Sequence, residues 1–185
     1  VIREGLAKGA DRAIHLKEDT MLTDPLRIAK SFSTVLKNEN FDLILTGLQS
    51  DDTGMGQTGV LIGEILGTST ATLVIETDIQ ENKVRVKREL ESGWFQWITL
   101  PLPASLSIQS GLNNPRYPSL KGIMGAKRKD IKIIPETEHN KQKQFQEIDI
   151  VFIPKTDKKT EFIEGDVDTT VIKIIKILKT EVKVI

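Results

Sequence analysis

A continuous apolar run at residues 41–46 constrains the fold of this chain most, because Gly47 stops it at the length of one strand. An apolar run without polar alternation is typical of a parallel strand that is covered on both faces. Residues 13–16 form a shorter apolar run after a turn that contains Gly9, and we expect a second buried strand there.

Helices are predicted on both sides of residues 41–46. The first has Asp24 as a candidate N-cap and Pro25 at the first helical position, and apolar residues recur at helical spacing as far as Leu36. The second begins near Thr58 and closes at Gly67, which suits a left-handed cap. This alternation of strand and helix predicts an α/β fold with a parallel sheet.

An antiparallel excursion is predicted next, because three stretches rich in strand-forming residues are separated by short polar turns. In the middle stretch Val84 and Val86 alternate with charged residues, so one face of that strand is expected to be wet. The three stretches cover residues 70–79, 83–90 and 94–100, and apolar strands are expected after them at residues 104–109 and 131–134.

The aromatic residues of the third stretch are predicted to be structural. We place Trp94 and Trp97 on one face of the strand with Phe95 opposite, in the core or at a subunit interface. Residues 111–125, which follow the excursion, are expected to form a loop.

The C-terminal part of the chain has a different composition. Residues 136–147 are charged and glutamine-rich, as linkers are. A strand is predicted at residues 148–153, and a helix with an apolar face at residues 169–179 with Asp168 as its cap. We therefore divide the chain into a nucleotide-binding α/β domain, residues 1–135, and a C-terminal linker and partner-wrapping arm, residues 136–185.

Composition excludes several classes of function. Lys plus Arg and Asp plus Glu balance at 26 each, so no net charge favours nucleic acid or an anionic membrane. The chain has no cysteine and only two histidines, His15 and His139, which argues against disulfides, thiolate chemistry and a metal site. No apolar run reaches the roughly 20 residues that span a bilayer. No Ser–His–Asp set or carboxylate pair indicates catalysis, so no catalytic residue is assigned.

The stretch between the strand at residues 41–46 and the following helix is glycine-rich. Ligands of open parallel sheets bind at the carboxyl ends of strands, and a helix start offers free N–H groups to an anion. The stretch lacks the lysine of a phosphate-binding P-loop and the spaced glycines of a dinucleotide fingerprint. On pattern alone a nucleotide site and an unliganded turn are about equally favoured. The candidate cofactor-binding residues are Gly47, Gln49, Ser50, Asp51, Asp52, Gly56, Gln57 and Thr58.

Five motifs together resemble the beta subunits of electron-transfer flavoproteins, in the order that this family has them. They cover about residues 7–134, and jointly they are specific although each alone is not. They are Gly-Ala-Asp-Arg at residues 9–12, the loop at 47–59 that ends Gly-Gln-Thr-Gly, Val-Arg-Val-Lys-Arg-Glu at 84–89 followed by Gly93, Leu-Pro-Leu-Pro-Ala at 100–104, and Asn-Pro-Arg-Tyr-Pro-Ser-Leu at 114–120 followed by Ile-Met-Gly-Ala-Lys at 123–127.

The resemblance implies an adenine-nucleotide hydrolase-like (Rossmann-like) domain that pairs with a larger alpha subunit, which holds most of the redox-active FAD. The loop at residues 47–58 would bind AMP as a structural nucleotide, although Gly56 stands where many relatives have a side-chain donor. Such a subunit is an electron carrier and not an enzyme. It passes electrons from acyl-CoA and related dehydrogenases, in fatty acid oxidation, to a membrane quinone oxidoreductase.

A recognition loop is also implied by the resemblance. Its leucine, here Leu120, fills an apolar pocket of the partner dehydrogenase. The expected partner-docking residues are Arg116, Tyr117, Leu120, Ile123 and Met124. Family members also begin with about 80 residues that have no counterpart here, and they are cytoplasmic in bacteria and in the mitochondrial matrix of eukaryotes.

Other interpretations remain open at this point. A bifurcating flavoprotein would hold a second FAD in place of AMP, but the Asp51-Asp52 and Gln57-Thr58 version of the loop is more similar to the AMP-holding group. An ATP-binding stress-type module of the same fold would self-associate and would not need residues 114–127. A nucleotide-hydrolysing enzyme would need a phosphate-binding lysine or a carboxylate cluster, and the loop contains neither.

Overall fold

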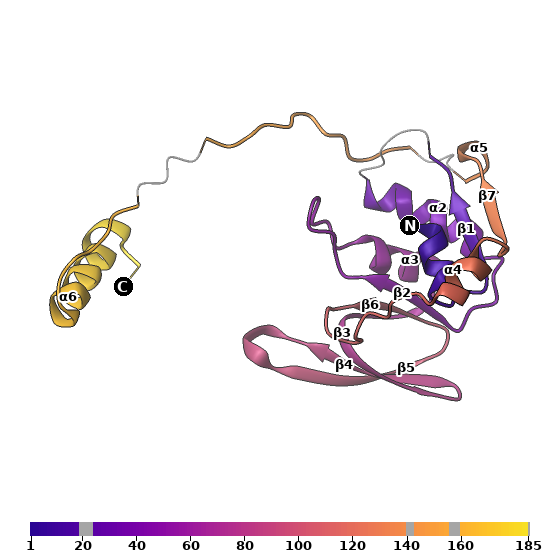
Figure 1. Cartoon of the computed structure of the whole chain (residues 1–185), viewed down its shortest axis with the longest axis horizontal. Helices are drawn as coiled ribbons and strands as arrows, with labels where there is room; N and C mark the ends of the chain where they lie inside the picture. The colour runs from indigo at the N-terminus through magenta and orange to yellow at the C-terminus, as the bar shows by residue number, and fades with distance from the viewer. Residues whose placement is uncertain (19–23, 140–142, 156–159, 185) are drawn as a thin grey trace. The chain divides into compact units, whose positions relative to one another are not determined.

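The computed structural model of the chain describes residues 1–18, 24–139, 143–155 and 160–184 (Figure 1). The predicted N-cap Asp24 therefore lies just inside the described residues. The chain forms two compact units, Val1–Ile148 and Asp149–Ile185, and each is considered by itself below. None of the helices in these ranges is long and apolar enough to cross a membrane.

Two sheets form the first unit. A parallel pair, β1 with β7, stands apart from a five-stranded sheet of order β2-β6-β3-β4-β5. In the larger sheet β2, β6 and β3 run parallel, and β3, β4 and β5 form the antiparallel meander. This confirms a mixed α/β fold with parallel strands. The strands are β1 (Ala13–Leu16), β2 (Leu43–Gly47), β3 (Ser69–Gln80), β4 (Lys83–Glu89), β5 (Phe95–Pro101), β6 (Ala104–Ile108) and β7 (Ile131–Ile134).

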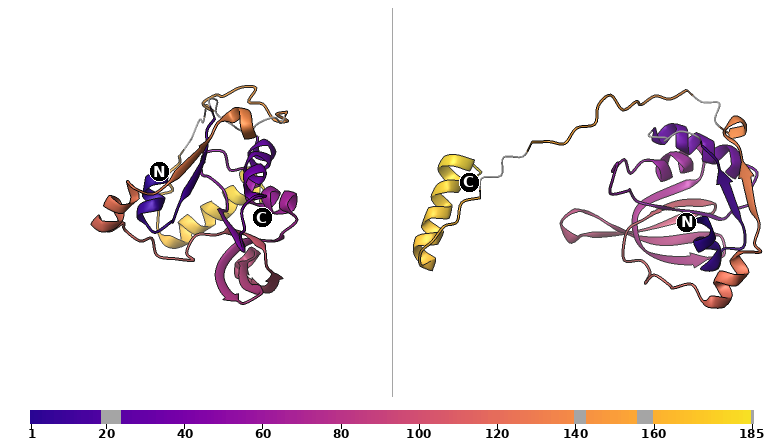
Figure 2. Two further views of the ribbon diagram at one scale, coloured as in Figure 1. Left: turned by 90° about the vertical axis from the view of Figure 1, so that its right-hand side faces the viewer. Right: turned by 45° about the horizontal axis from the view of Figure 1, so that its top comes forward.

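Four of the helices of this unit pack in pairs. Helices α2 and α3 lie side by side against the parallel end of the larger sheet, and α1 packs on α4 (Figures 1 and 2). A short 3-10 turn, Glu91–Gly93, joins β4 to β5. The helices are α1 (Ile2–Ala7), α2 (Pro25–Leu36), α3 (Thr58–Leu66), α4 (Leu120–Ala126) and α5 (Glu136–His139), and α6 (Val167–Ile177) belongs to the second unit.

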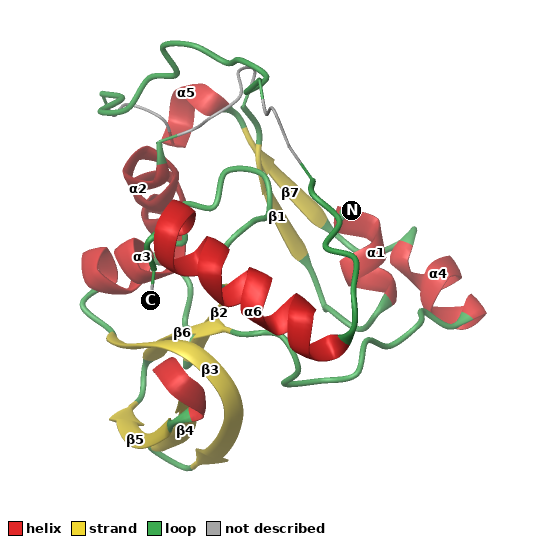
Figure 3. Cartoon of the chain, turned by 90° about the vertical axis from the view of Figure 1, so that its left-hand side faces the viewer, coloured by secondary structure: helices red, strands yellow, loops and turns green. Residues whose placement is uncertain are grey.

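The main core lies on the inner face of the larger sheet, where β3 curves strongly (Figure 3). Val84 and Val86 of β4 are fully buried there with Val74 of β3 and Leu106 of β6. The wet outer face predicted for β4 is confirmed, since Arg85 between the two valines is exposed. A smaller cluster of Ala29, Ile44 and Ile62 joins α2 and α3 to β2.

The prediction that β2 is covered on both faces is wrong for the described residues. Leu45 is 61% exposed, whereas its neighbour Ile44 is buried against α2 and α3. The reason is that α2 and α3 pack on the face of β2 that holds Ile44, and Leu45 points to the opposite face.

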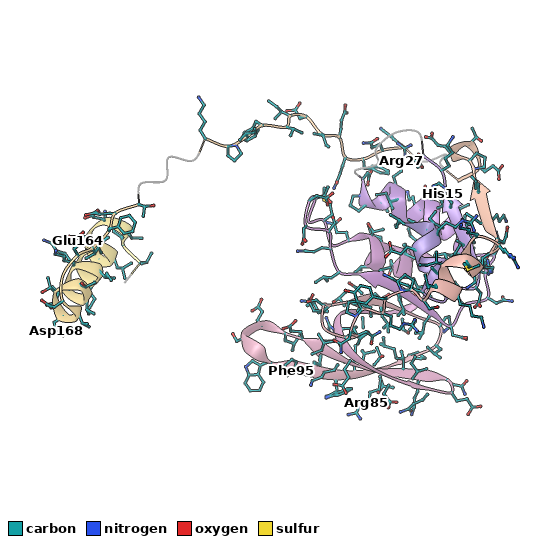
Figure 4. All side chains as sticks on the ribbon, in the orientation of Figure 1. His15, Arg27, Arg85, Phe95, Glu164 and Asp168 are labelled. Carbon is teal, nitrogen blue, oxygen red and sulfur yellow. The ribbon has the colours of Figure 1, made fainter. Side chains whose placement is uncertain are left out.

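The placement of the aromatic residues of β5 needs correction. Phe95 and Trp97 share the outer face, because side chains in a strand alternate with a period of two residues. The Lys87 ammonium lies 4.5 Å from the Phe95 ring centre, and the Arg85 guanidinium lies 4.5 Å from that of Trp97. Arg85 and Phe95 are labelled in Figure 4. Trp94 precedes the strand and is 73% exposed. These rings are therefore outside the core, which leaves the subunit-interface hypothesis.

Three predictions for the later part of the chain are also wrong. Residues 111–125 are not all loop, because α4 begins after Ser119, whose hydroxyl accepts the Gly122 N–H at 3.0 Å. Residues 148–153 form no strand, since no described strand pairs with them. Helix α6 is capped by Asp166, which accepts the Thr169 N–H at 2.9 Å, so Asp168 falls in the first turn.

The predicted cap of α2 is confirmed, and it has a second role. One Asp24 carboxylate oxygen accepts the Leu26 N–H at 2.9 Å, and the other accepts the Phe145 N–H at 2.6 Å. Asp24 is 1% exposed. Burial raises its pKa, but the backbone N–H groups, with Phe145 foremost, outweigh burial and lower the pKa below its ordinary value of 3.8.

We expect Asp24→Ala to lower the free energy of unfolding by about 2 kcal/mol, because it removes a cap and hydrogen bonds to a charged acceptor. Because the pKa of Asp24 is lowered on folding, its contribution is complete above the unfolded-state pKa and disappears as pH falls through the folded-state value. Urea unfolding of the wild type and the variant at pH 7, and then at steps below pH 4, measures both effects. A difference in stability that does not shrink in acid would contradict this assignment.

Candidate functional site

A pocket of about 420 Å³ opens at the carboxyl end of β2. Its wall consists of the end of β2 with the loop that follows it, the first turn of α3, and Pro25 and Ile28 of α2. The structure brings six of the eight predicted cofactor-binding residues to this wall, namely Gly47, Gln49, Ser50, Gly56, Gln57 and Thr58. Asp51 and Asp52 lie in the exposed tip of the loop and do not line the pocket.

The tip of the loop is closed by its own hydrogen bonds. The Ser50 carbonyl accepts the Gly54 N–H at 3.0 Å, the hydroxyls of Ser50 and Thr53 are 3.0 Å apart, and Asp52 accepts the Thr53 N–H at 2.7 Å. The bonds from Ser50 and then Thr53 hold the pKa of Asp52 below its ordinary value. Gly54 has a φ of +62°, which favours glycine. Asp52 therefore stays ionised at neutral pH and shapes the turn.

The beginning of α3 is suited to an anion. Its N-cap residue, Gln57, makes no side-chain capping bond. The first N–H groups of this nine-residue helix are therefore not capped by the Gln57 side chain. Thr58 in the first turn adds a hydroxyl, and Met55 and Ile28 give the wall an apolar part. Free N–H groups, the helix dipole and an apolar wall together match a phosphorylated, ring-containing ligand.

Thr46 and Gly59 are site residues that sequence reasoning missed. A Cβ on Gly59 would lie 2.1 Å from the Thr46 Oγ1 atom, so only glycine lets α3 begin this close to β2. The Thr46 hydroxyl is buried and has no hydrogen-bond partner among the described residues, although Thr46 lines the pocket. The position of Thr46 at the carboxyl end of an apolar strand, just before Gly47, is the signal that could have identified it as a site residue.

The predicted docking residues lie in and just before α4, and three of them share one side of that helix. Leu120, Ile123 and Met124 follow the i, i+3, i+4 spacing of one helix side and are 82%, 44% and 70% exposed. Tyr117 in the preceding loop is 97% exposed. Arg116 is directed elsewhere, since its guanidinium donates to the Lys8 carbonyl at 3.1 Å.

Metal chemistry has no support in the described ranges, where no cluster of three or more His, Cys, Asp and Glu side chains could hold an ion. The described residues that line the pocket include no titratable side chain, so the lining offers no general base. The arrangement of the site is that of a binding pocket with a separate exposed apolar helix side.

Comparison with known proteins identifies a family. The family model of the electron transfer flavoprotein domain matches residues 1–139. Electron transfer flavoprotein subunit beta of Methylophilus methylotrophus is 32% identical over 187 residues, which covers 96% of this chain and 70% of that protein. The subunit beta of Bradyrhizobium diazoefficiens is 39% identical over 130 residues, 70% of this chain and 51% of that protein. The Sus scrofa protein of the same name is 35% identical over 136 residues, 72% and 53% of the two chains. The chain thus spans about half the length of the last two relatives.

Proposed function

The chain belongs to the electron transfer flavoprotein family, and we propose that it acts as the small, nucleotide-holding subunit of a heterodimeric electron carrier. The single observation that supports this function best is the pocket at the carboxyl end of β2, with the uncapped start of α3 in its wall. In an electron carrier such a pocket needs to hold a nucleotide and needs no catalytic groups.

The nucleotide we propose for this pocket is AMP, in a domain of the adenine-nucleotide hydrolase-like type. The phosphate would accept hydrogen bonds from the first N–H groups of α3 and from the Thr58 hydroxyl. Gln57 and Gln49 offer side-chain amides to the rest of the ligand. Met55 and Ile28 would contact the base. AMP has no redox chemistry, so its role is to hold the loop after β2 against the start of α3.

The redox cofactor we propose is FAD, held mostly by a larger alpha subunit that is not part of this chain. Electrons would enter from acyl-CoA and related dehydrogenases and leave to a membrane quinone oxidoreductase, in the bacterial cytoplasm or the mitochondrial matrix. Within this chain, the exposed side of α4 supports the docking step. Leu120 forms a small exposed apolar surface with Ile123 and Met124, which suits fast and reversible contact.

The linker and arm at residues 136–185 are proposed to wrap the larger subunit. Residues 148–153 are extended and contain five large apolar side chains that are 54–92% exposed. On α6, Val171, Ile174 and Ile175 are 41–47% exposed and share one side of the helix. Apolar side chains exposed along a whole segment indicate a partner that covers them.

Co-expression with the larger subunit tests this assembly. We expect Ile174→Asn to weaken retention of the larger subunit and of FAD in gel filtration, because an amide would be buried without a partner. Lys176→Asn on the same helix is the matched control and should behave as the wild type. Equal retention in both variants would exclude α6 as a contact, and absence of flavin from the wild-type complex would contradict the proposed function itself.

A further inference from the structure

The carboxyl end of α1 is capped by cations from a distant part of the chain. The Lys129 ammonium donates to the carbonyls of Leu6, at 3.1 Å, and Ala10, and the Arg116 guanidinium donates to the Lys8 carbonyl at 3.1 Å. The last carbonyls of a helix have no partner within it and carry the negative end of its dipole. Two cations that flank α4 in the sequence therefore satisfy the end of α1.

The carboxyl end of α4 is capped in return from α1. The Arg3 guanidinium donates to the carbonyl of Ala126, the last residue of α4, and to the Lys129 carbonyl at 2.9 Å. Side-chain bonds thus tie the carboxyl end of each helix to a residue in or beside the other helix, across 108 to 126 residues of sequence. We call this set of bonds from Arg3, Arg116 and Lys129 the brace.

Between the bonds of the brace, the two backbones touch at one glycine. A Cβ on Gly122 would lie 2.4 Å from the Ala7 carbonyl oxygen of α1. Gly125, on the same helix, has nothing within 4 Å of the corresponding position. Gly122 therefore permits the close approach, and a side chain there would push α4 away from α1.

We propose that α1 is the platform that sets the orientation of α4, with Gly122 and the brace as positioning residues for docking. This inference depends on the proposed docking role of Leu120. A helix of seven residues has little stability of its own, so its orientation must come from packing. The brace fixes Leu120 and Met124 before a partner arrives, which lowers the entropic cost of association. Arg116, which the family resemblance placed among the docking contacts, belongs to the brace instead.

The test compares Gly122→Ala with Gly125→Ala in the complex of this chain with its larger subunit. Both variants replace glycine by alanine in α4, but only the first places a methyl group against the Ala7 carbonyl. We expect Gly122→Ala to raise the KM for the flavoprotein about tenfold, with the dehydrogenase that reduces the wild type, because a displaced hot-spot residue loses most of its contact. The kcat, the bound nucleotides and direct reduction by dithionite should not change. Gly125→Ala should match the wild type in all of these.

Lys129→Met tests the brace without adding volume, with Lys127→Met as a control of equal charge. We expect a higher KM for Lys129→Met only. Equal KM values within both pairs of variants would overturn the platform role, provided that Leu120→Ala raises the KM in the same assay. If Leu120→Ala leaves the KM unchanged, the proposed docking role of α4 has failed, and the positioning role fails with it.

Discussion

Leu120→Ala is expected to raise the KM of the partner dehydrogenase for the flavoprotein about 30-fold, while kcat and the bound nucleotides stay as in the wild type. Leu120 is 82% exposed in this chain, so its removal costs the free subunit little. An apolar anchor that fills a partner pocket contributes about 2 kcal/mol or more to association, which is about 30-fold.

Leu90→Ala is the control for this effect, because Leu90 is an exposed leucine beside the turn between β4 and β5 and belongs to neither proposed site. Steady-state reduction of the flavoprotein at varied concentration gives both constants. An unchanged KM for Leu120→Ala, or an equal rise for Leu90→Ala, would remove the anchor role and leave the nucleotide pocket unaffected.

Leu106→Ala is expected to lower the free energy of unfolding by about 3 kcal/mol, since it opens a cavity where β2, β6 and β3 meet. Leu106 is fully buried among Val74, Val84 and Val86. Leu45 lies directly opposite Leu106 in the pairing of β2 with β6 but is 61% exposed. Leu45→Ala should therefore cost less than about 1 kcal/mol in the isolated chain.

Urea unfolding of the two variants measures the difference in their free energies of unfolding. Both variants make the same chemical change, on adjacent strands. The midpoint should fall for Leu106→Ala and stay near that of the wild type for Leu45→Ala. Similar losses for both would mean that Leu45 is covered in solution.

Local signals explain which helices could be predicted from the sequence. Asp24 and Pro25 mark the start of α2, and Gly67, with a φ of +67°, closes α3, because each acts within one turn of its own helix. Helix α4 escaped prediction since Gly122 and Gly125 lower its intrinsic propensity. Its stability comes from contacts with α1, more than 100 residues away in sequence.

Packing between separate elements also explains which residues of the candidate site were missed. The glycine-rich loop could be located from its place after an apolar strand, and six of its predicted residues line the pocket. The contact of Gly59 with Thr46 depends on how α3 packs on β2, which no local pattern specifies. Residues 148–153 have strand-forming composition, but a strand also needs a neighbour, and pairing is not encoded in one segment.

The identity of the nucleotides in the native complex tests the central claim most directly. The complex that contains this chain would be purified, denatured, and its released nucleotides identified and counted by chromatography and mass spectrometry. We predict FAD and AMP in equal amounts. Two FAD per complex would contradict the AMP assignment and indicate a bifurcating flavoprotein, and ATP or no adenine nucleotide besides FAD would contradict the proposed role of the pocket.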